Sequence, residues 1–509
     1  MKRMIKLSPY YLLLLLTACS TGIPDKSQKM DKTVRLYPDY MEVTIPYNIA
    51  PLNFIVKEEG EDCVIKVSGE NNHSIIVQGG KKMKVRFPEK KWKKLLSENK
   101  GKYLIYDIFV KQGGSWIQYN SFKNKVAEEA IDPYLTYRLI EPSYQTSGEM
   151  GLFQFNLETA EEKTIILTPR LTQTPDDLNL KCVNCHVSRG NDNLFYYRKK
   201  DGGMILTYQE KTYKVNTKAG DMFASTVYPA WHPFLPFIVF SSNELGQVFV
   251  STGLEKIEVL DRRSDLVLYD IEKNEITHIF KTKNKQETNP CWSPDGKYLY
   301  FGSSDSTLTD LRAYSNMKYD IKRVSFDPES KICGEIETVY DASGQGKSAA
   351  YPCVSPDGKY LLFVVSNHGS APYTHPEADL YLMNLETGES RALAEANSPE
   401  SEGYIDWSSS GRWFVVSSRR QDGNYARPYF VYFDKEGNAH KPFGIPHKDP
   451  AHDANVVKGY NVPRFSTTPV NVSQAKLNEV VAGPVIDAIY GSEIEEIPDG
   501  QSGASVIEK

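Results

Sequence analysis

The segment Cys182-Val183-Asn184-Cys185-His186 carries the residue types and spacing that indicate chemistry most specifically. Two thiols separated by two residues can both add to the vinyl groups of one haem, and the next residue then places its imidazole under the iron as an axial ligand. With 7 Cys and 9 His in 509 residues, chance would give about 0.002 such motifs per chain. The motif therefore predicts one covalently bound c-type haem, attached through Cys182 and Cys185 and ligated by His186.

Three other uses of the same motif stay open. A structural zinc ion usually takes four protein ligands, and the chain has no second Cys-x-x-Cys. A thioredoxin-type dithiol is expected in a βαβ setting, whereas the surrounding sequence has the pattern of strands and turns. A disulfide suits an exported protein, but a bond between two cysteines so close in sequence does little to stabilise a fold. Covalent haem is the favoured interpretation, and zinc and a disulfide are the alternatives.

A candidate for the sixth iron ligand is His232, which lies in a repeated hairpin. The corresponding residue in three other copies is serine, namely Ser293, Ser355 and Ser408. Since those copies form without an imidazole, the exception points to a local role for His232. One role is that of a distal iron ligand opposite His186, and the other is that of a turn histidine bonded to a backbone carbonyl. Two methionines compete for the same iron position, Met204 and Met222.

The first nineteen residues have the pattern of an export signal, with a basic start and a short apolar run over 10–16. The quartet Leu16-Thr17-Ala18-Cys19 resembles the lipobox of bacterial lipoproteins, whose cysteine is acylated and becomes the first mature residue. This resemblance implies a signal peptide over 1–19, a membrane anchor on Cys19 and a polar tether over 20–40. An ordinary signal peptide cut near Ala18 is the alternative. Ser20 replaces the Asp that favours inner-membrane retention in such lipoproteins, so we expect an outer-membrane lipoprotein that faces the periplasm.

Composition narrows the classes of protein that remain. Lys and Arg number 60 against 65 Asp and Glu, a net charge of −5, which gives no basic footprint and predicts no nucleic-acid binding. No apolar run reaches the ~18–20 residues that a membrane-spanning helix needs. Aromatic residues make up 12% of the chain, and Gly and Pro are frequent. This mixture favours a protein of strands and turns.

Residues 41–130 have short β-rich runs with one helix between them. Strands are expected over 53–56, 63–67, 74–77 and 103–110. Pro88 begins a helix that Trp92, Leu95 and Leu96 make amphipathic and that Gly101 follows. The pattern predicts a small β-sandwich-like domain.

An internal repeat dominates the rest of the chain. The segment 290–299, Pro-Cys-Trp-Ser-Pro-Asp-Gly-Lys-Tyr-Leu, recurs with one change at 352–361, and weaker copies begin at Pro229 and Trp407. Each copy has a strand, a tight turn and a second strand, and two further strands fit each repeat. The sequence predicts an all-β fold with a β-propeller of about six blades, within a range of five to seven, over 131–443. A C-terminal extension is expected over 444–509.

The repeated hairpins resemble those of TolB-like (WD-like) propellers, well over about 220–443 and weakly over 145–220. The lipobox, the β-rich N-terminal domain, the single Cys-x-x-Cys-His and this propeller together resemble a group of bacterial lipoproteins, often labelled cytochrome c-like. Members of that group have Phe-His-x-Arg after the haem motif. This chain differs, because it has Phe195-Tyr196-Tyr197-Arg198 at that place.

Two functional hypotheses follow from these features. The first is a lipid-anchored protein whose propeller presents a single haem c for electron transfer or for docking of a redox partner that the sequence does not identify. The second is a haem-free periplasmic scaffold or binding protein. The chain has no Gly-x-Ser-x-Gly after residue 443, so a propeller peptidase is not expected, and a non-catalytic role is favoured over an enzymatic one.

Overall fold

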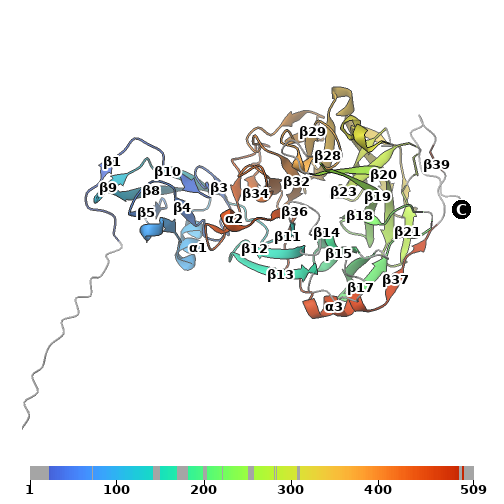
Figure 1. Ribbon diagram of the computed structural model, residues 1–509, viewed down its shortest axis with the longest axis horizontal. Helices are drawn as coiled ribbons and strands as arrows, with labels where there is room; N and C mark the ends of the chain where they lie inside the picture. The colour runs from blue at the N-terminus through green and yellow to red at the C-terminus, as the bar shows by residue number, and fades with distance from the viewer. Residues whose placement is uncertain are drawn as a thin grey trace, which may run out of the picture.

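The computed structural model of the protein describes residues 22–497 (Figure 1), except 72, 141–149, 169–181, 199–202, 221, 250–256, 280, 283, 306–309 and 492–495. The expected signal peptide over 1–19, with the acylation site Cys19, lies outside the described residues. Among the residues described, no helix is both long and apolar enough to span a bilayer.

Six antiparallel sheets form the propeller, each with a first strand at the centre of the ring. Blade 1 has β36 (Gly459–Ser466), β11 (Tyr134–Ile140), β12 (Gly151–Asn156) and β13 (Glu161–Leu167). Blade 2 has β14 (Cys182–Arg189), β15 (Asp192–Arg198), β16 (Met204–Tyr208) and β17 (Lys211–Asn216). Blade 3 has β18 (Thr226–Trp231), β19 (Phe237–Phe249), β20 (Ile257–Asp270) and β21 (Glu275–His278).

The other three blades continue the ring. Blade 4 has β23 (Gln286–Trp292), β24 (Tyr298–Ser304), β25 (Asp320–Asp327), β26 (Ile332–Cys333) and β27 (Glu337–Tyr340). Blade 5 has β28 (Ser348–Val354), β29 (Tyr360–Ser366), β30 (Asp379–Asn384) and β31 (Ser390–Ala392). Blade 6 has β32 (Glu402–Trp407), β33 (Trp413–Ser418), β34 (Arg427–Tyr432) and β35 (Phe443–Gly444). The inner strands β14, β18, β23, β28, β32 and β36 each contact the next around the ring, so the predicted all-β propeller of six blades is confirmed in the described residues.

The hairpin between the first two strands of a blade is fixed by its serine and its Asp-Gly turn. Ser293 Oγ donates to Asp295 Oδ1 (2.6 Å) and accepts from the Tyr298 N–H (2.9 Å). Gly296 has φ +70°, a left-handed conformation that glycine adopts without strain. The copy at Ser355 has the same two hydrogen bonds, of 2.6 and 3.0 Å. The repeated sequence therefore encodes a repeated turn, as predicted.

The ring is closed by a strand from the C-terminal segment. Strand β36 pairs antiparallel with β11, which comes more than 300 residues earlier, and serves as the inner strand of blade 1. The boundary expected at residue 443 is therefore wrong, because it leaves out the strand that completes the first blade. Beyond β36, helix α3 (Gln474–Ala482) packs on the core of blades 1 and 2. Strands β37 (Val485–Asp487), β38 (Ile489–Tyr490) and β39 (Glu496–Ile497) then pair parallel with β17, β21 and β22 (Lys281–Thr282).

The N-terminal domain has two sheets and one long helix. The larger sheet has β1 (Gln28–Lys29), β9 (Ser115–Gln118), β8 (Tyr103–Gln112), β10 (Phe122–Val126), β3 (Thr44–Ile45), β5 (Asp62–Ser68) and β6 (Ser74–Gln78). The smaller sheet has β2 (Leu36–Tyr37), β4 (Phe54–Val56) and β7 (Lys84–Val85), and the helix is α1 (Glu89–Glu98). The four strands and the helix predicted within this domain are all present.

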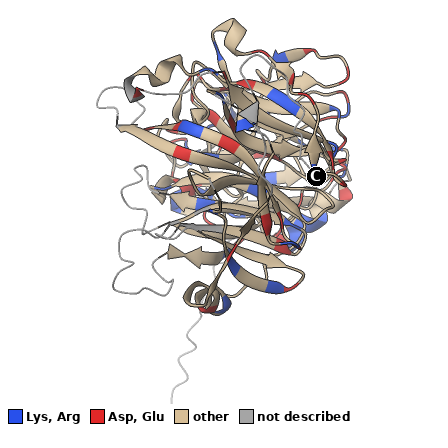
Figure 2. Ribbon diagram, turned by 90° about the vertical axis from the view of Figure 1, so that its right-hand side faces the viewer, with Lys and Arg blue, Asp and Glu red and all other residues tan. Residues whose placement is uncertain are grey.

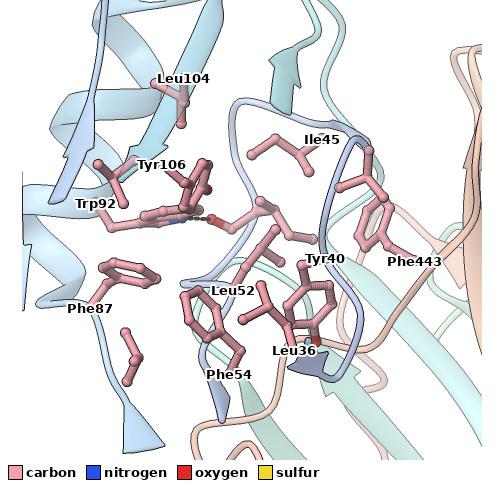
Figure 3. Close-up of a cluster of buried hydrophobic side chains, with 14 of the residues drawn as sticks. Leu36, Tyr40, Ile45, Leu52, Phe54, Phe87, Trp92, Leu104, Tyr106 and Phe443 are labelled. Carbon is pink, nitrogen blue, oxygen red and sulfur yellow. Dashed lines mark hydrogen bonds between the residues drawn. The ribbon is translucent and has the colours of Figure 1, made fainter. Parts of the chain in front are cut away.

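The tether expected over 20–40 is shorter than predicted, because two strands of the domain lie inside that range. Strand β1 pairs with β9, and β2 pairs with β4. Val34, Leu36 and Tyr40 are buried in the domain core (Figure 3). Burial of their apolar surface stabilises the folded protein, and exposure in a solvated tether would lose this stabilisation.

The N-terminal domain and the propeller share one hydrophobic core. Trp92 stacks on Phe87 and donates from Nε1 to the Ile49 carbonyl (3.1 Å), and Phe443 from β35 belongs to the same cluster (Figure 3). Tyr40 also donates to the carbonyl of Ile445 (2.9 Å). The domain is therefore packed on the propeller through buried contacts.

Charged residues of both signs are interspersed over the side of the propeller that Figure 2 shows. This arrangement agrees with the balanced composition of the chain. The absence of nucleic-acid binding stays a prediction.

Candidate functional site in the propeller channel

Each inner strand of the propeller is interrupted at the same place by a β-bulge. The register of pairing shifts at 183/186, 227/230, 288/291, 350/353 and 402/405, and opposite β36 at 136/138. Four residues at the bulges have φ between 49° and 55°, namely Tyr228, Asn289, Tyr351 and Val462. Bulges re-aim side chains and are frequent beside functional sites. The Cys-x-x-Cys-His segment occupies this bulge in blade 2, where several other blades have a proline.

A cavity of about 60 Å³, partly open to solvent, lies where these bulges meet at the centre of the ring, in the central channel of the propeller. Blade 2 contributes Cys185 and His186 to its lining. The other blades contribute three tyrosines, three prolines, two aliphatic residues and two polar residues: Tyr228, Pro229, Asn289, Pro290, Tyr351, Pro352, Tyr404, Ile405, Val462 and Arg464. Every blade therefore presents its inner strand to one shared cavity.

His186 is buried, with 3% of its surface exposed. Neither ring nitrogen has a hydrogen-bond partner among the described residues. Burial and the Arg464 guanidinium lower the pKa of His186 to about 3. The nearby backbone of Thr136 raises this pKa, but by less than the other two causes lower it. The imidazole is therefore neutral at physiological pH, the form in which histidine binds metals.

Cys185 is a buried, free thiol beside His186 in the cavity lining. Burial raises its pKa, although the Tyr228 backbone and two arginines oppose the effect. The backbone of Cys182 pairs with Arg198 in β15, and its side chain is not among those that the structure describes. The structure thus brings Cys185 and His186 together, while the predicted role of Cys182 stays a prediction.

An ion pair from two other blades lies in the same channel. Arg464 Nη1 is 3.1 Å from Asp406 Oδ1, and the second oxygen of Asp406 accepts from the Phe465 N–H (2.7 Å). Nε of Arg464 is buried without a hydrogen-bond partner in the described part of the chain. This pair was not predicted from the sequence. The signal was present in Val462-Pro463-Arg464-Phe465-Ser466, which repeats the Pro-x-Trp-Ser register of the hairpin copies.

Cys291 and Cys353 take the same bulge position as His186 in blades 4 and 5. The two half-buried thiols are hydrogen-bond neighbours. Donation from Cys353 lowers the pKa of Cys291 and raises that of Cys353. Each thiol directly follows the bulge of its inner strand, and these strands, β23 and β28, are neighbours in the ring.

His232 does not line the cavity, and both of its ring nitrogens are occupied. Nδ1 accepts from the N–H groups of Phe234 (3.2 Å) and Leu235 (3.0 Å), and Nε2 lies 3.2 Å from the Gly296 carbonyl. The ring packs against Trp292 at 4.7 Å. The structure therefore contradicts a role for His232 as the distal iron ligand. This hairpin lacks an Asp-Gly turn, and the imidazole caps it as serine does in the sister copies.

The two competing methionines are also remote from the channel lining. Met204 and Met222 are buried in one hydrophobic cluster of blades 2 and 3. Neither lines the cavity. Both serve as core residues in this structure.

The described residues fit a covalently attached haem in three respects. A cysteine and the histidine of the motif face one cavity, and both histidine nitrogens are available. Tyrosine and proline side chains supply flat apolar walls. Arg464 offers a buried guanidinium N–H to which a haem carboxylate could bind.

Comparison with known proteins gives a distant likeness to other structures. No protein-family model matches the chain, and no curated protein matches it. TolB from Acinetobacter baumannii is 14% identical with a TM-score of 0.38, over 67% of this chain and 78% of TolB. An oligogalacturonate lyase in complex with manganese is 14% identical with a TM-score of 0.37, over 61% of this chain and 79% of the lyase. Likeness at this level says nothing about what this chain binds or catalyses.

Proposed function

We propose that this protein is a lipid-anchored c-type haem protein of the bacterial cell envelope, whose propeller presents one haem to a redox partner. The observation that carries the proposal is the place of the Cys-x-x-Cys-His segment. Cys185 and His186 lie at the bulge of an inner strand and line the shared cavity of the channel. A bound haem supplies a one-electron carrier at this position.

Each residue of the channel has a distinct part in this proposal. Cys182 and Cys185 would hold the haem covalently, and His186 would bind its iron. Asp406 orients Arg464 through the 3.1 Å ion pair, and Arg464 pairs with a haem carboxylate. The bulge of β14 keeps Cys185 and His186 directed into the same cavity.

In this proposal, the first residues of the chain determine where the protein lies in the cell. Acylation of Cys19 anchors the protein in the outer membrane, and the propeller lies on the periplasmic side. Attachment of c-type haem takes place outside the cytoplasmic membrane, so export and haem binding agree. The redox partner would bind at the open side of the cavity that Cys185 and His186 line.

A pyridine haemochrome spectrum of the protein matured with its own signal tests the proposal. We expect a c-type spectrum with one haem per chain. The variant Cys182→Ala/Cys185→Ala should lose it, because no thioether can form. Cys291→Ala/Cys353→Ala is the matched control, since it removes two thiols of other inner strands, outside the motif, and should keep the spectrum. If the unaltered protein has no covalent haem, the haem-free propeller scaffold is the better account.

A further inference from the structure

A second cluster of ligand-type side chains lies on long connections outside the channel lining. Glu258 belongs to β20, in the extended β19–β20 hairpin of blade 3. His368 and His375 belong to the connection between β29 and β30 in blade 5, which includes the short 3-10 helix η7 (Pro372–Thr374). The cluster thus joins two blades that are not neighbours in the ring.

The ligand atoms of the three residues lie within 4.8 Å of one another. Nε2 of His375 is 2.9 Å from one Glu258 oxygen, and Nε2 of His368 is 3.5 Å from the other. Ligands of one tetrahedral zinc lie roughly 3.4 Å apart, since each bond is about 2.1 Å long. The two measured distances fall on either side of that value.

Burial makes this cluster of polar groups energetically unfavourable unless a cation is bound. Glu258 and His375 are 3% and 2% exposed. Nδ1 of His375 is buried and has no hydrogen-bond partner in the described residues, and Nε2 of His368 is buried with only the long 3.5 Å contact to Glu258. Buried polar atoms without hydrogen-bond partners destabilise the folded protein. A cation bound by the imidazoles and the carboxylate would satisfy Nε2 of His368.

Hydrogen bonds connect the cluster to the wall of the channel. Ser370, two residues after His368, donates from Oγ to Asp261 (2.7 Å), and its carbonyl accepts from Asn289 (3.3 Å). Asn289 lines the channel cavity. The loop that carries the two histidines is therefore held beside the channel.

We propose that Glu258, His368 and His375 form a binding site for one divalent transition-metal ion, with zinc as the probe that identifies it. Two imidazoles and a carboxylate are a donor set of zinc and non-haem iron sites, in which further coordination positions stay open for water or substrate. The site is independent of the proposed haem, since it shares no residue with the Cys-x-x-Cys-His segment.

A second group of similar residues serves as an internal comparison. His447, His452 and Asp453 also lie close together. However, Nε2 of His452 is 3.1 Å from the Tyr460 hydroxyl. The Arg427 guanidinium donates to the Asp453 carbonyl (2.7 Å) and places a positive charge beside the group. Cation binding is therefore disfavoured there.

Calorimetric titration of the full, chelator-treated mature protein with Zn²⁺ tests the site. We expect one ion per chain. Glu258→Gln and His368→Ala should weaken binding by more than roughly 100-fold, because even changes in the outer shell cost 10- to 100-fold. His452→Gln and Cys182→Ala/Cys185→Ala should leave binding unchanged, and the latter variant separates this site from the haem motif.

X-ray absorption at the zinc edge of the unaltered protein gives a reading that does not depend on the folding of a variant. We expect nitrogen and oxygen neighbours at about 2.0–2.2 Å and no sulfur at about 2.3 Å. Sulfur neighbours would place the ion at cysteines and overturn the proposal. Lack of stoichiometric binding, or equal binding by Glu258→Gln, would overturn it as well.

Discussion

His186 and His232 are both buried, yet their surroundings give them opposite roles. His186 has no hydrogen-bond partner for either nitrogen among the described residues, whereas His232 makes three contacts with backbone groups. A buried imidazole without partners is available as a ligand, and one with partners is a structural element. The sequence singled out both residues, but their hydrogen bonds could not be predicted because the partners are backbone groups placed by the fold.

The variant His232→Ala tests the structural role of this residue. It removes the cap of the hairpin and the ring that packs against Trp292. We expect the free energy of unfolding to fall by about 1–3 kcal/mol, which thermal or urea denaturation would measure. The haem spectrum should not change, and a loss of the low-spin signal would restore His232 as an iron ligand.

Reactivity should distinguish Cys291, on an inner strand of the propeller, from the core thiols Cys63 and Cys333. Cys63 and Cys333 are 0% and 1% exposed, and burial raises the pKa of each thiol to about 12. Cys291 is partly exposed, and the hydrogen bond from Cys353 lowers its pKa. In the folded, reduced Cys182→Ala/Cys185→Ala variant, iodoacetamide should therefore modify Cys291 well before Cys63 or Cys333. Peptide mapping measures the order, and equal rates at all three sites would contradict the assignment.

The inner strands show how far sequence patterns predict elements and where they fail. The hairpins with Pro-Asp-Gly turns are held by local hydrogen bonds to Ser293 and Ser355, so the local sequence was sufficient to predict them. Strand β36 has no such turn, and its partner β11 is distant in sequence. The meeting of Cys185, His186 and Arg464 in one cavity depends on ring closure, so spacing along the chain could not predict it.

Glu287 on strand β23 should make stability depend on pH. Burial raises its pKa from 4.5 to about 8, although Thr282 donates a hydrogen bond of 2.7 Å that opposes the effect. Between these two pH values the folded state binds more protons than the unfolded state, so stability falls as pH rises. Glu287→Gln should remove a slope of up to about 1.4 kcal/mol per pH unit.

Unfolding midpoints across that pH range measure this effect. Glu335→Gln, an exposed carboxylate of the same blade, is the matched control and should leave the pH dependence as it is. The same slope in protein with and without Glu287 would show that another group is responsible.

The arrangement of the molecule depends on its last segments as much as on its repeats. Strand β36 completes blade 1, and helix α3 covers the adjoining core. The N-terminal domain packs on blade 6 through the cluster that contains Trp92, Trp413 and Phe443. Composition and repeats predicted a small domain followed by a propeller, but not this shared core, since contacts between distant segments leave no local pattern.

Truncation should show that ring closure is required. A chain that ends at residue 443 lacks β36 and leaves the inner edge of β11 unpaired, so we expect aggregation and no cooperative thermal transition. A chain that ends at residue 483 keeps β36 and α3 and loses only outer strands. It should stay monodisperse and melt cooperatively, as size-exclusion chromatography and calorimetry would show. Cooperative folding of the shorter chain would contradict the assignment of β36.

The most direct test of the central claim is mass spectrometry of the peptide that contains Cys182 and Cys185, taken from protein matured with its own export signal. If the channel motif holds haem c, this peptide carries the mass of one haem joined through two thioether bonds. The peptides with Cys291 and Cys353 carry none. Recovery of the motif peptide with free thiols, a disulfide or no haem mass would contradict the account.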